Sequence, residues 1–561
     1  MYRLVTGTQS TAYEAIAKVA GPWGPAVQAD LPEVEQTVRF RFAGQTLVGR
    51  GEARFYESGA FYTDPAVFQV FSFPLLQGDP RTALAAPNSV VLTASVARKY
   101  FGDDDPLGQA LTFDGEQDVT VTGVMADVPA PSHFTFPFLL SRASEPDSLQ
   151  YDWGRTQYYT YLLLAPGTNP DAVTAKIPAV LAKHLGAEEA AVYAPRLQAV
   201  ADIHLHSNLF REMAANADIT YVYLFIAVAF FILLIACINF MNLATARSAR
   251  RAKEVGVRKA AGAGRSALVR QFLGESLLMS LLALVMALDL VSMLLPAFNT
   301  LTGKTLEMSR LLAPAFTLGL AGLTLFVGVV SGSYPAFVLA SYRPMEVLKG
   351  RVQGRGHAGL RKGLVVFQFA VSVFLIIAAV VVQGQLRTVR IRPERMDETL
   401  AALETTWAQF EPDHPFTYSF LDEQFARLYL AERGVGTLLG YATILAIFIA
   451  CLGLFGLASF TAEQRTKELG IRKVLGATVG QIVLLLSKDF ARLVVLALVV
   501  AAPVAYFAME AWLAGFAYHA ALSAWIFITA GGAALLVALL TVSYQAIRAA
   551  LADPVKSLRY E

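Results

Sequence analysis

The sequence predicts a membrane α-helical protein, with seven spans in two tandem repeats, that also carries an α+β domain outside the membrane. Of its 561 residues 55% are hydrophobic, but residues 1–218 are mixed and polar, while residues 219–561 hold nearly all the long apolar runs. KEVGVRKAAGA at 253–263 returns as KELGIRKVLGA at 467–477, with a constant offset of 214. SYPAFVLASYRP at 333–344 returns as SYQAIRAALADP at 543–554. A duplicated membrane unit is typical of proteins that move a substrate or transmit a motion.

The first 219 residues are predicted to form the α+β domain. Alternating runs at Val38–Phe42 and Val119–Val124 indicate strands. Residues 93–102 and 170–186 have the residues that begin and end short helices. This order favours a mixed sheet. His204 and His206 alternate on an expected strand, but a metal site needs two further ligands and no nearby Cys or His supplies them, so no metal is predicted.

Seven apolar runs are long enough for membrane helices, since a bilayer requires about 20 mostly apolar residues. The predicted spans are 220–246, 268–297, 311–341, 363–387, 436–461, 482–512 and 521–547.

Basic residues are concentrated in the loops on one side of these spans. Residues 247–270 and 343–362 are rich in Lys and Arg, and each range contains a single acid, Glu254 or Glu346. The loop 464–473 and the C-terminal tail are also basic. Short cytoplasmic loops of membrane proteins are enriched in Lys and Arg. We therefore expect this side and the C-terminus to be cytoplasmic and the N-terminal domain to lie outside.

The repeats divide the chain into five predicted parts. Each membrane module contains three spans and one basic helix, at about 251–263 in the first and 465–477 in the second. A further span precedes the second module and has no counterpart before the first, so we expect a leading helix to be missing there. The parts are an outer domain at 1–219, a first module at 220–350, a linker with the leading span of the second half at 351–387, a short outer segment at 388–435 with amphipathic helices at 396–410 and 418–433, and a second module at 436–561.

The two basic helices carry the strongest functional signal. Glu254 and Arg258 have the i,i+4 spacing that stabilises a helix by about 0.3–0.5 kcal/mol, as do their counterparts in the second copy. Glycine costs about 1 kcal/mol inside a helix, so a glycine at the same interior position of both copies indicates that another group comes close there. A later glycine suits a C-terminal cap. The predicted functional residues are Glu254, Gly256, Arg258, Lys259 and Gly262 in the first copy and Glu468, Gly470, Arg472, Lys473 and Gly476 in the second.

The alternative for these helices is a basic anchor that only fixes topology. An anchor needs positive charge and no fixed order of Glu, Gly, Arg and Lys, which argues against this alternative. Glu275 and Asp489 are also equivalent, near the cytoplasmic start of their spans. They are candidates for intramembrane support that pairs with the basic helices, the alternative being acids that face lipid headgroups. Cys237 and Cys451 occupy equivalent apolar positions and are interpreted as packing residues.

Three common catalytic or nucleotide-binding motifs have no complete match in the sequence. Gly303-Lys304-Thr305 is like the end of a phosphate-binding loop, but Phe298 stands where the first glycine of that motif belongs. No other stretch offers such a loop, and neither Gly-x-Ser-x-Gly nor HExxH occurs. The chain itself is predicted to bind no cofactor and to have no catalytic residues.

Longer segments resemble a known family along almost the whole chain. SVVLTASVARKYFGDDDPLGQALTF (89–113), VTVTGVMADVPAPSHFTFPFLLS (119–141) and DIHLHS (202–207) look like a MacB-like periplasmic core domain. Three further segments resemble the permease modules of FtsX-like, or MacB-type, subunits of ABC transporters: IACINFMNLATARSARRAKEVGVRKAAGA (235–263), IACLGLFGLASFTAEQRTKELGIRKVLGA (449–477) and DPVKSLRYE (553–561).

This resemblance implies four spans per half and a separate cytoplasmic ATPase that docks on the two basic helices. Compared with this family, we expect the chain to lack the first membrane helix and most of a second periplasmic domain. A dimer of permeases is implied, either a homodimer or a pseudo-symmetric dimer, in the bacterial inner membrane with the N-terminal domain in the periplasm. Partners would be the ATPase, the lipid bilayer and a periplasmic or outer-membrane protein, with no nucleic acid.

The resulting expectation is a permease that transmits ATP-driven motion across the membrane for export or efflux. The alternative is a non-transporting mechanotransmission regulator of an envelope enzyme or a sensor kinase, because both would use the same stroke. An ion-coupled transporter needs ionisable residues near the bilayer midplane, whereas the acids here lie near span ends. A membrane enzyme is the least favoured class, because the sequence offers no set of catalytic residues.

Overall fold

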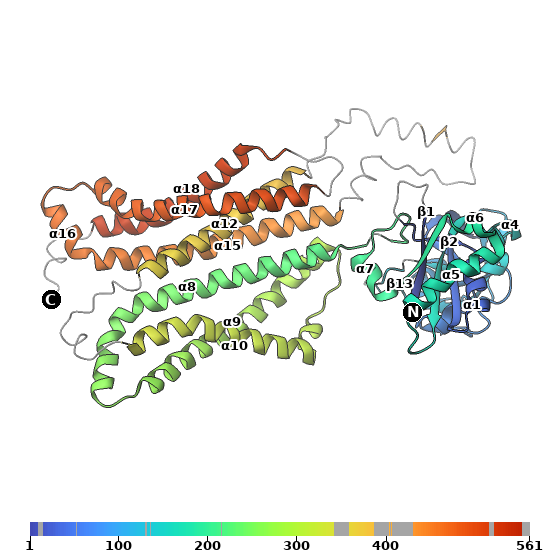
Figure 1. The fold of residues 1–561 in the computed structure, drawn as a ribbon, viewed down its shortest axis with the longest axis horizontal. Coiled ribbons are helices and arrows are strands. Elements are labelled where there is room, and N and C mark those ends of the chain that lie inside the picture. Colours follow the sequence, from blue (N-terminus) through green and yellow to red (C-terminus); the bar gives the residue numbers. More distant parts are fainter. Residues whose placement is uncertain are drawn as a thin grey trace. The chain divides into compact units, whose positions relative to one another are not determined.

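The computed structural model of the protein describes most of the chain (Figure 1). Internal contacts divide it into two units, one made of Met1–Val222 and Arg392–Phe420 and the other of Tyr223–Ile391 and Leu421–Glu561. The description leaves out residues 9–14, 52, 130–131, 135, 215, 342–357, 386–402, 404, 407–429, 515–520 and 552–561, and the side chains of 8, 246–250, 252–253, 358, 360, 384–385, 430–433 and 467.

The first unit is an α+β domain built on one mixed sheet. Its strands are β1 (Tyr2–Thr8), β2 (Val19–Ala20), β3 (Val34–Phe42), β4 (Gln45–Arg50), β5 (Ala53–Ser58), β6 (Ala60–Thr63), β7 (Leu75–Gln77), β8 (Ser89–Thr93), β9 (Ala110–Phe113), β10 (Gln117–Met125), β11 (Phe138–Ser141), β12 (Thr156–Leu164) and β13 (Tyr193–Ala199). They pair in the order β13-β1-β12-β3-β6-β11-β8-β10-β9-β4-β5, with β2 beside β12 and β7 beside β10. The pairs β8–β10 and β6–β11 are parallel, and the other pairs are antiparallel.

The helices of this unit lie between the strands or, for α7, directly after the last one. They are α1 (Trp23–Asp30), α2 (Val67–Val70), α3 (Ala94–Phe101), η1 (Arg142–Ser144), α4 (Asp147–Gln150), α5 (Pro170–Leu185), α6 (Ala187–Ala190) and α7 (Val200–His206). Both predicted strands and both predicted helices are confirmed, as β3, β10, α3 and α5. Thr93 and Gly102 hold the N-cap and C-cap positions of α3, as predicted, and the Asp127 carboxylate accepts the hydrogen bond from the Ser95 N–H, at 3.0 Å.

The predicted strand around His204 and His206 is wrong. Both residues lie in helix α7, which follows β13 directly. In the run VADIHLH only Ile203 is buried, and a single buried side chain fits a short helix as well as a strand. No group of three or more His, Cys, Asp or Glu that could hold a metal occurs among the described residues.

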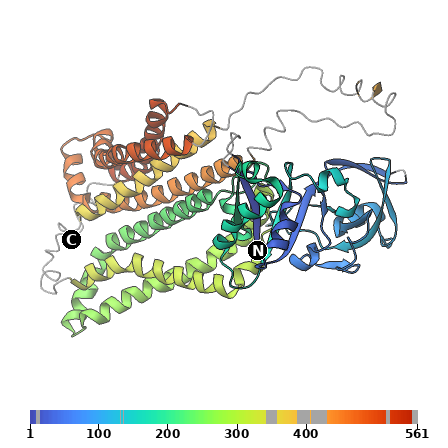
Figure 2. The ribbon, with the colours of Figure 1, turned by 45° about the vertical axis from the view of Figure 1, so that its right-hand side comes forward.

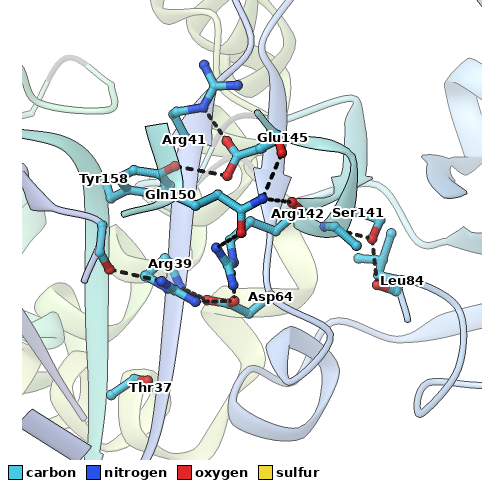
Figure 3. A network of polar contacts seen from close by, with 12 residues as sticks. Thr37, Arg39, Arg41, Asp64, Leu84, Ser141, Arg142, Glu145, Gln150 and Tyr158 are labelled. Carbon is cyan, nitrogen blue, oxygen red and sulfur yellow. Dashed lines mark hydrogen bonds and ion pairs between the residues drawn. The ribbon is translucent and has the colours of Figure 1, made fainter. Parts of the chain in front are cut away.

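A buried polar network fastens the segment of η1 and α4 to the sheet (Figure 3). Asp64 accepts hydrogen bonds from Arg39, at 2.7 Å, and from Arg142, at 2.6 Å. Beside them Glu145 pairs with Arg41 and accepts the Tyr158 hydroxyl hydrogen bond at 2.9 Å. Buried charges are tolerated in a protein when they are paired in this way.

The second unit is helical. Its helices are α8 (Ile219–Ala260), α9 (Arg265–Thr302), η2 (Met308–Leu312), α10 (Pro314–Ser341), α12 (Ala358–Gln385), α15 (Leu430–Gln464), α16 (Thr466–Val474), α17 (Val479–Leu513) and α18 (Ala524–Leu551). Within the described residues, seven of these are long and apolar enough to cross a bilayer, which confirms the predicted spans. The short helix α16 is an extra element. The predicted amphipathic helices between α12 and α15 lie outside the described residues, apart from isolated positions.

Helix α12 forms the centre of the second half. It packs against α15, α17 and α18, and 61% of the residues in its most apolar stretch are buried. Polar side chains reinforce the packing: Gln368 donates to the Ala450 carbonyl at 3.0 Å, and Thr443 donates to the Leu375 carbonyl at 3.2 Å. Hydrogen bonds of this kind between membrane helices are worth about 0.6 kcal/mol on average.

The first half packs α9 against α10 but leaves a groove beside them. Gly328 and Gly332 of α10 let the two helices approach closely, because an added Cβ would come within 3.0 Å of Leu277 and 2.5 Å of Ser276. A cavity of about 290 Å³ opens between α8, α9 and α10. Its counterpart in the second half measures about 40 Å³, because Phe369, Ser372 and Ile376 of α12 line it. Among the described residues, no helix occupies the corresponding place in the first half.

Candidate functional site

The two predicted basic helices lie at the same end of the membrane helices (Figures 1 and 2). Their construction differs from the prediction in one respect. The first copy is not a separate short helix, because α8 runs without a break from Ile219 to Ala260. The second copy is separate: α15 ends at Gln464, Arg465 leaves helical geometry, and α16 begins at Thr466. We call the end of α8 from Arg251 to Ala260 and helix α16 the coupling helices, after the role that the family resemblance implies for them.

Both coupling helices end in the same hydrogen-bonded cap. Gly262 has φ +95° and Gly476 has φ +92°, a conformation that favours glycine. The Ala263 N–H donates to the Arg258 carbonyl and the Gly262 N–H to the Lys259 carbonyl, each at 3.0 Å. The corresponding two bonds end α16, also at 3.0 Å. This is the Schellman arrangement, and it confirms both glycines as C-terminal caps.

The predicted i,i+4 ion pairs are present in both copies. Glu254 lies 2.7 Å from Arg258, and Glu468 lies 2.9 Å from Arg472. Each of these four side chains is between 44% and 47% exposed, so the pairs belong to the outer surface of the helices. Pairs this exposed add only a few tenths of a kcal/mol to helix stability, which leaves their charges available to a partner.

The inner side of each coupling helix is packed against the membrane helices. Val255 and Gly256 are buried in the first copy, and Leu469 and Gly470 are buried at the same positions of the second. Val255 lies in an apolar cluster with residues of α9 and α10, and Leu469 lies in the corresponding cluster of α17 and α18. Burial of both glycines is consistent with the predicted close approach, although Gly470 also lines a cavity beside α18, so the close approach itself stays a prediction.

The two lysines of the pattern are half-buried at the edge of this packing. The Lys259 ammonium donates to the carbonyl of Ala340, at 2.7 Å, and so fastens the coupling helix to the end of α10. Burial, followed by the charge of Arg265, lowers the pKa of Lys259. Lys473 lines a cavity of about 360 Å³ between α16 and α18, together with Gln545 and Arg548.

Glu275 and Asp489 are joined to the coupling helices by a second pair of ion contacts. Arg251 lies 2.7 Å from Glu275, and Arg465 lies 3.4 Å from Asp489. Arg251 and Arg465 are themselves 214 residues apart, so the contact repeats at equivalent positions. It links the start of each coupling helix to the span that follows. Neither arginine was predicted as the partner of these acids, although the constant offset between the repeats was sufficient to find both.

The outer surface also carries apolar residues, which the sequence pattern did not predict. Val257 is 58% exposed and lies between Glu254 and Arg258 in the sequence. Ile471, its equivalent, is 52% exposed, and Val474 and Leu475 beside it are 66% and 81% exposed. Each coupling helix therefore presents an apolar side chain flanked by a charge pair. Apolar residues with a charged border are the usual composition of a protein-binding surface.

Comparisons with known proteins place the chain in a family. The family model of the MacB-like periplasmic core domain matches residues 4–180. The model of the FtsX-like permease C-terminal region matches twice, at 226–344 and 440–554. The chain belongs to the FtsX/MacB-type family of ABC transporter permeases. Its described residues combine seven apolar helices with an α+β domain of the periplasmic type.

Curated relatives and solved structures are similar over parts of the chain. The macrolide export ATP-binding/permease protein MacB of Agrobacterium fabrum is 28% identical over 50% of this chain and 42% of its own length. MacB of Neisseria gonorrhoeae is 25% identical over 46% of this chain and 38% of its own length. The chain thus spans less than half of these relatives. The crystal structure of the periplasmic region of MacB from Actinobacillus actinomycetemcomitans is 13% identical, with a TM-score of 0.28, and covers 36% of this chain and 90% of its own.

Proposed function

We propose that the chain is the membrane subunit of an ATP-driven exporter, and that a separate cytoplasmic ATPase docks on the two coupling helices. The observation that carries this proposal is the doubled outer surface, in which Val257 and Ile471 are exposed beside equivalent ion pairs. Attraction to lipid headgroups requires positive charge alone. Exposed apolar side chains next to paired charges favour a protein partner.

The rest of each coupling helix is built to pass a push on to the membrane helices. Its inner side is packed, its end is capped, and its start is paired with Glu275 or Asp489 on the next span. In the proposed mechanism, ATP binding closes the partner ATPases and tilts both coupling helices, and the spans carry the movement to the periplasmic domain. The chain contributes docking and leverage, while ATP hydrolysis takes place in the partner.

The charge distribution supports an inner-membrane orientation for this mechanism. The basic loops would lie in the cytoplasm, with the coupling helices and the C-terminus, and the α+β domain would lie in the periplasm. This is the arrangement that allows an ATPase of the cytoplasm to reach both coupling helices.

The docking role is tested by placing charge on the two surfaces. In the variant carrying Val257→Asp and Ile471→Asp, and in the variant carrying Arg258→Glu and Arg472→Glu, the purified chain should lose co-purifying ATPase and ATP hydrolysis. The partner is recognised by mass spectrometry as a protein with a phosphate-binding loop. A photo-reactive amino acid at position 257 or 471 should cross-link to the same protein.

A matched control is Arg310→Glu, because Arg310 is an exposed arginine on η2, at the other end of the helices. This variant should keep its ATPase. Should both double variants remain folded and retain the ATPase at the wild-type level, the coupling helices are not the docking surface.

A further inference from the structure

The two halves of the membrane unit meet where α8 and α15 run side by side (Figures 1 and 2). Val228 and Ile235 of α8 are buried in one apolar cluster with residues of α12 and α15. Both helices lead into a coupling helix, so they run in the same direction. Parallel helices that meet along one line are the arrangement expected at a two-fold axis.

The closest approach joins two equivalent positions. Asn239 of α8 and Gly453 of α15 are 214 residues apart, the same offset as the coupling helices. A Cβ atom added to Gly453 would lie 1.7 Å from the Oδ1 and 2.4 Å from the Cγ of Asn239. One turn further, a Cβ added to Gly456 would lie 2.1 Å from the Cδ2 of Leu243. When a residue touches its own equivalent, the contact lies on the two-fold axis.

The side chains at this axis are not the same in the two halves. Asn239 and Asn242 of α8 correspond to Gly453 and Gly456 of α15. Both asparagines are more than nine-tenths buried, at 7% and 3% exposed. The Asn239 amide nitrogen donates to the carbonyl of Ile449, while the Oδ1 atoms of both asparagines have no hydrogen-bond partner among the described residues. The contact is therefore a large polar side chain on one helix that fills the space left by glycine on the other.

This asymmetry distinguishes the possible pairings of the two helices. Two copies of α8 would place two asparagine side chains in the space that holds one, so the helices would have to separate. Two copies of α15 would bring glycine opposite glycine and would lose the hydrogen bond to Ile449. Only α8 with α15 has one filled and one open position. A single polar residue at a helix interface is known to select one pairing at some cost in stability.

We propose that one chain supplies both halves of the two-fold membrane unit, and that Asn239 and Gly453 specify the pairing of α8 with α15. A homodimer across this axis is then excluded. If the proposed function also holds, on which this step rests, each chain offers two coupling helices and binds two ATPase subunits.

Cysteine cross-linking tests the pairing directly. The Cβ atoms of residues 239 and 453 lie no more than about 4 Å apart, within disulfide reach. In a chain whose native Cys237 and Cys451 are replaced by alanine, Asn239→Cys with Gly453→Cys should form a disulfide in the monomer band on a non-reducing gel. A polymer-linked maleimide, which adds mass to the denatured chain for each free thiol, should produce no shift on the gel. The pair Phe230→Cys and Phe448→Cys, on exposed positions of the same helices, should stay reduced.

Co-expression separates pairing within one chain from pairing between chains. Two differently tagged chains, one with Asn239→Cys alone and the other with Gly453→Cys alone, should give no mixed dimer. A mixed dimer band, or a homodimer band from either single cysteine, would overturn the proposal. The cross-linking requires no ATPase, so its result can be interpreted even if the proposed docking is wrong. A negative cross-linking result, in turn, does not affect the docking tests.

Exchanging the two residues tests their role in specificity. Gly453→Asn places two asparagines at the axis and Asn239→Gly leaves none, so each variant should lose folded monomer in detergent, measured by size-exclusion chromatography. The double variant should recover it, because the asparagine introduced on α15 could then donate to the carbonyl of Ile235, the equivalent of Ile449. Gly434→Asn, an open position on α15, is the control that should behave as wild type. A double variant no better than Gly453→Asn alone would show that this pair does not determine the pairing.

Discussion

At the scale of a residue, Asp64 shows how neighbouring charges stabilise a buried carboxylate. Burial alone would raise the pKa of Asp64, but the charge and hydrogen bonds of Arg39, and then of Arg142, bring it below its usual value. Asp64→Asn would leave two guanidinium groups without their charge partner, and we expect the domain to lose about 3–5 kcal/mol of stability. Urea unfolding followed by the fluorescence of buried Trp23 measures the loss. Asp79→Asn, which removes an exposed pair with Arg81, should change stability by less than about 1 kcal/mol. Equal losses in both variants would contradict this account of the network.

His133 makes the stability of the α+β domain depend on pH. Burial, followed by the charge of Arg3, lowers the pKa of His133 to about 4, and its Nε2 lies 3.0 Å from the Tyr161 hydroxyl. The unfolded chain takes up a proton near the ordinary pKa of about 6.5, whereas the folded domain does not. The contribution of neutral His133 is therefore complete above pH 6.5 and is lost as the pH falls toward 4, by up to about 1.4 kcal/mol per pH unit.

Unfolding midpoints measured at several values between pH 7.5 and 4.5 test this slope. His133→Phe removes the titrating group and keeps an aromatic ring among Phe134 and Tyr161. The variant should therefore be less sensitive to acid than the wild type. An unchanged slope would assign the acid sensitivity to other groups.

At the scale of an element, the caps of the coupling helices depend on two glycines. Gly262→Ala and Gly476→Ala would force a side chain into positive φ, which costs about 1 kcal/mol or more and loosens the last turn. Faster hydrogen exchange of the Ala263 and Ala477 amides, which close the caps, measures the effect. Gly480→Ala is the control, because Gly480 lies near the start of α17 with open space at its Cβ. Unchanged exchange in both cap variants would mean that the caps do not hold these turns.

Much of each coupling helix could be predicted because the repeat supplied an internal comparison. The cap glycines and the ion pairs Glu254–Arg258 and Glu468–Arg472 depend only on local spacing. The exposure of Val257 and Ile471 depends on which side packs against other helices, and a short pattern does not contain that information. The continuity of α8 into its coupling helix also escaped prediction, because the equivalent break at Arg465 arises in only one of two similar sequences.

At the scale of the whole chain, composition alone separated the α+β domain from the membrane helices. Hydropathy predicted the seven spans that the described part of the chain contains, since a run of about 20 apolar residues is the strongest signal a sequence offers. Hydropathy does not reveal which helix fills which groove. The space between α8, α9 and α10 and the contact of Asn239 with Gly453 depend on how the helices are arranged in space. Neither was predicted, because spacing along the chain does not say which helices approach each other closely.

The orientation of the membrane unit is open to a direct test. Single cysteines at Val257 and Ile471, which are exposed on the coupling helices, should react with a membrane-impermeant maleimide in inside-out vesicles and stay unreactive in intact spheroplasts. Cysteines at Glu307, in the loop between α9 and α10, and at Leu76, 59% exposed on β7, should show the opposite pattern. Each pair of cysteines serves as the control for the other, because one pair should react in each preparation and so shows that the reagent and the cysteines are active there. Labelling of 257 and 471 from the outside would place the coupling helices beyond the reach of a cytoplasmic ATPase and would reverse the proposed direction of the push.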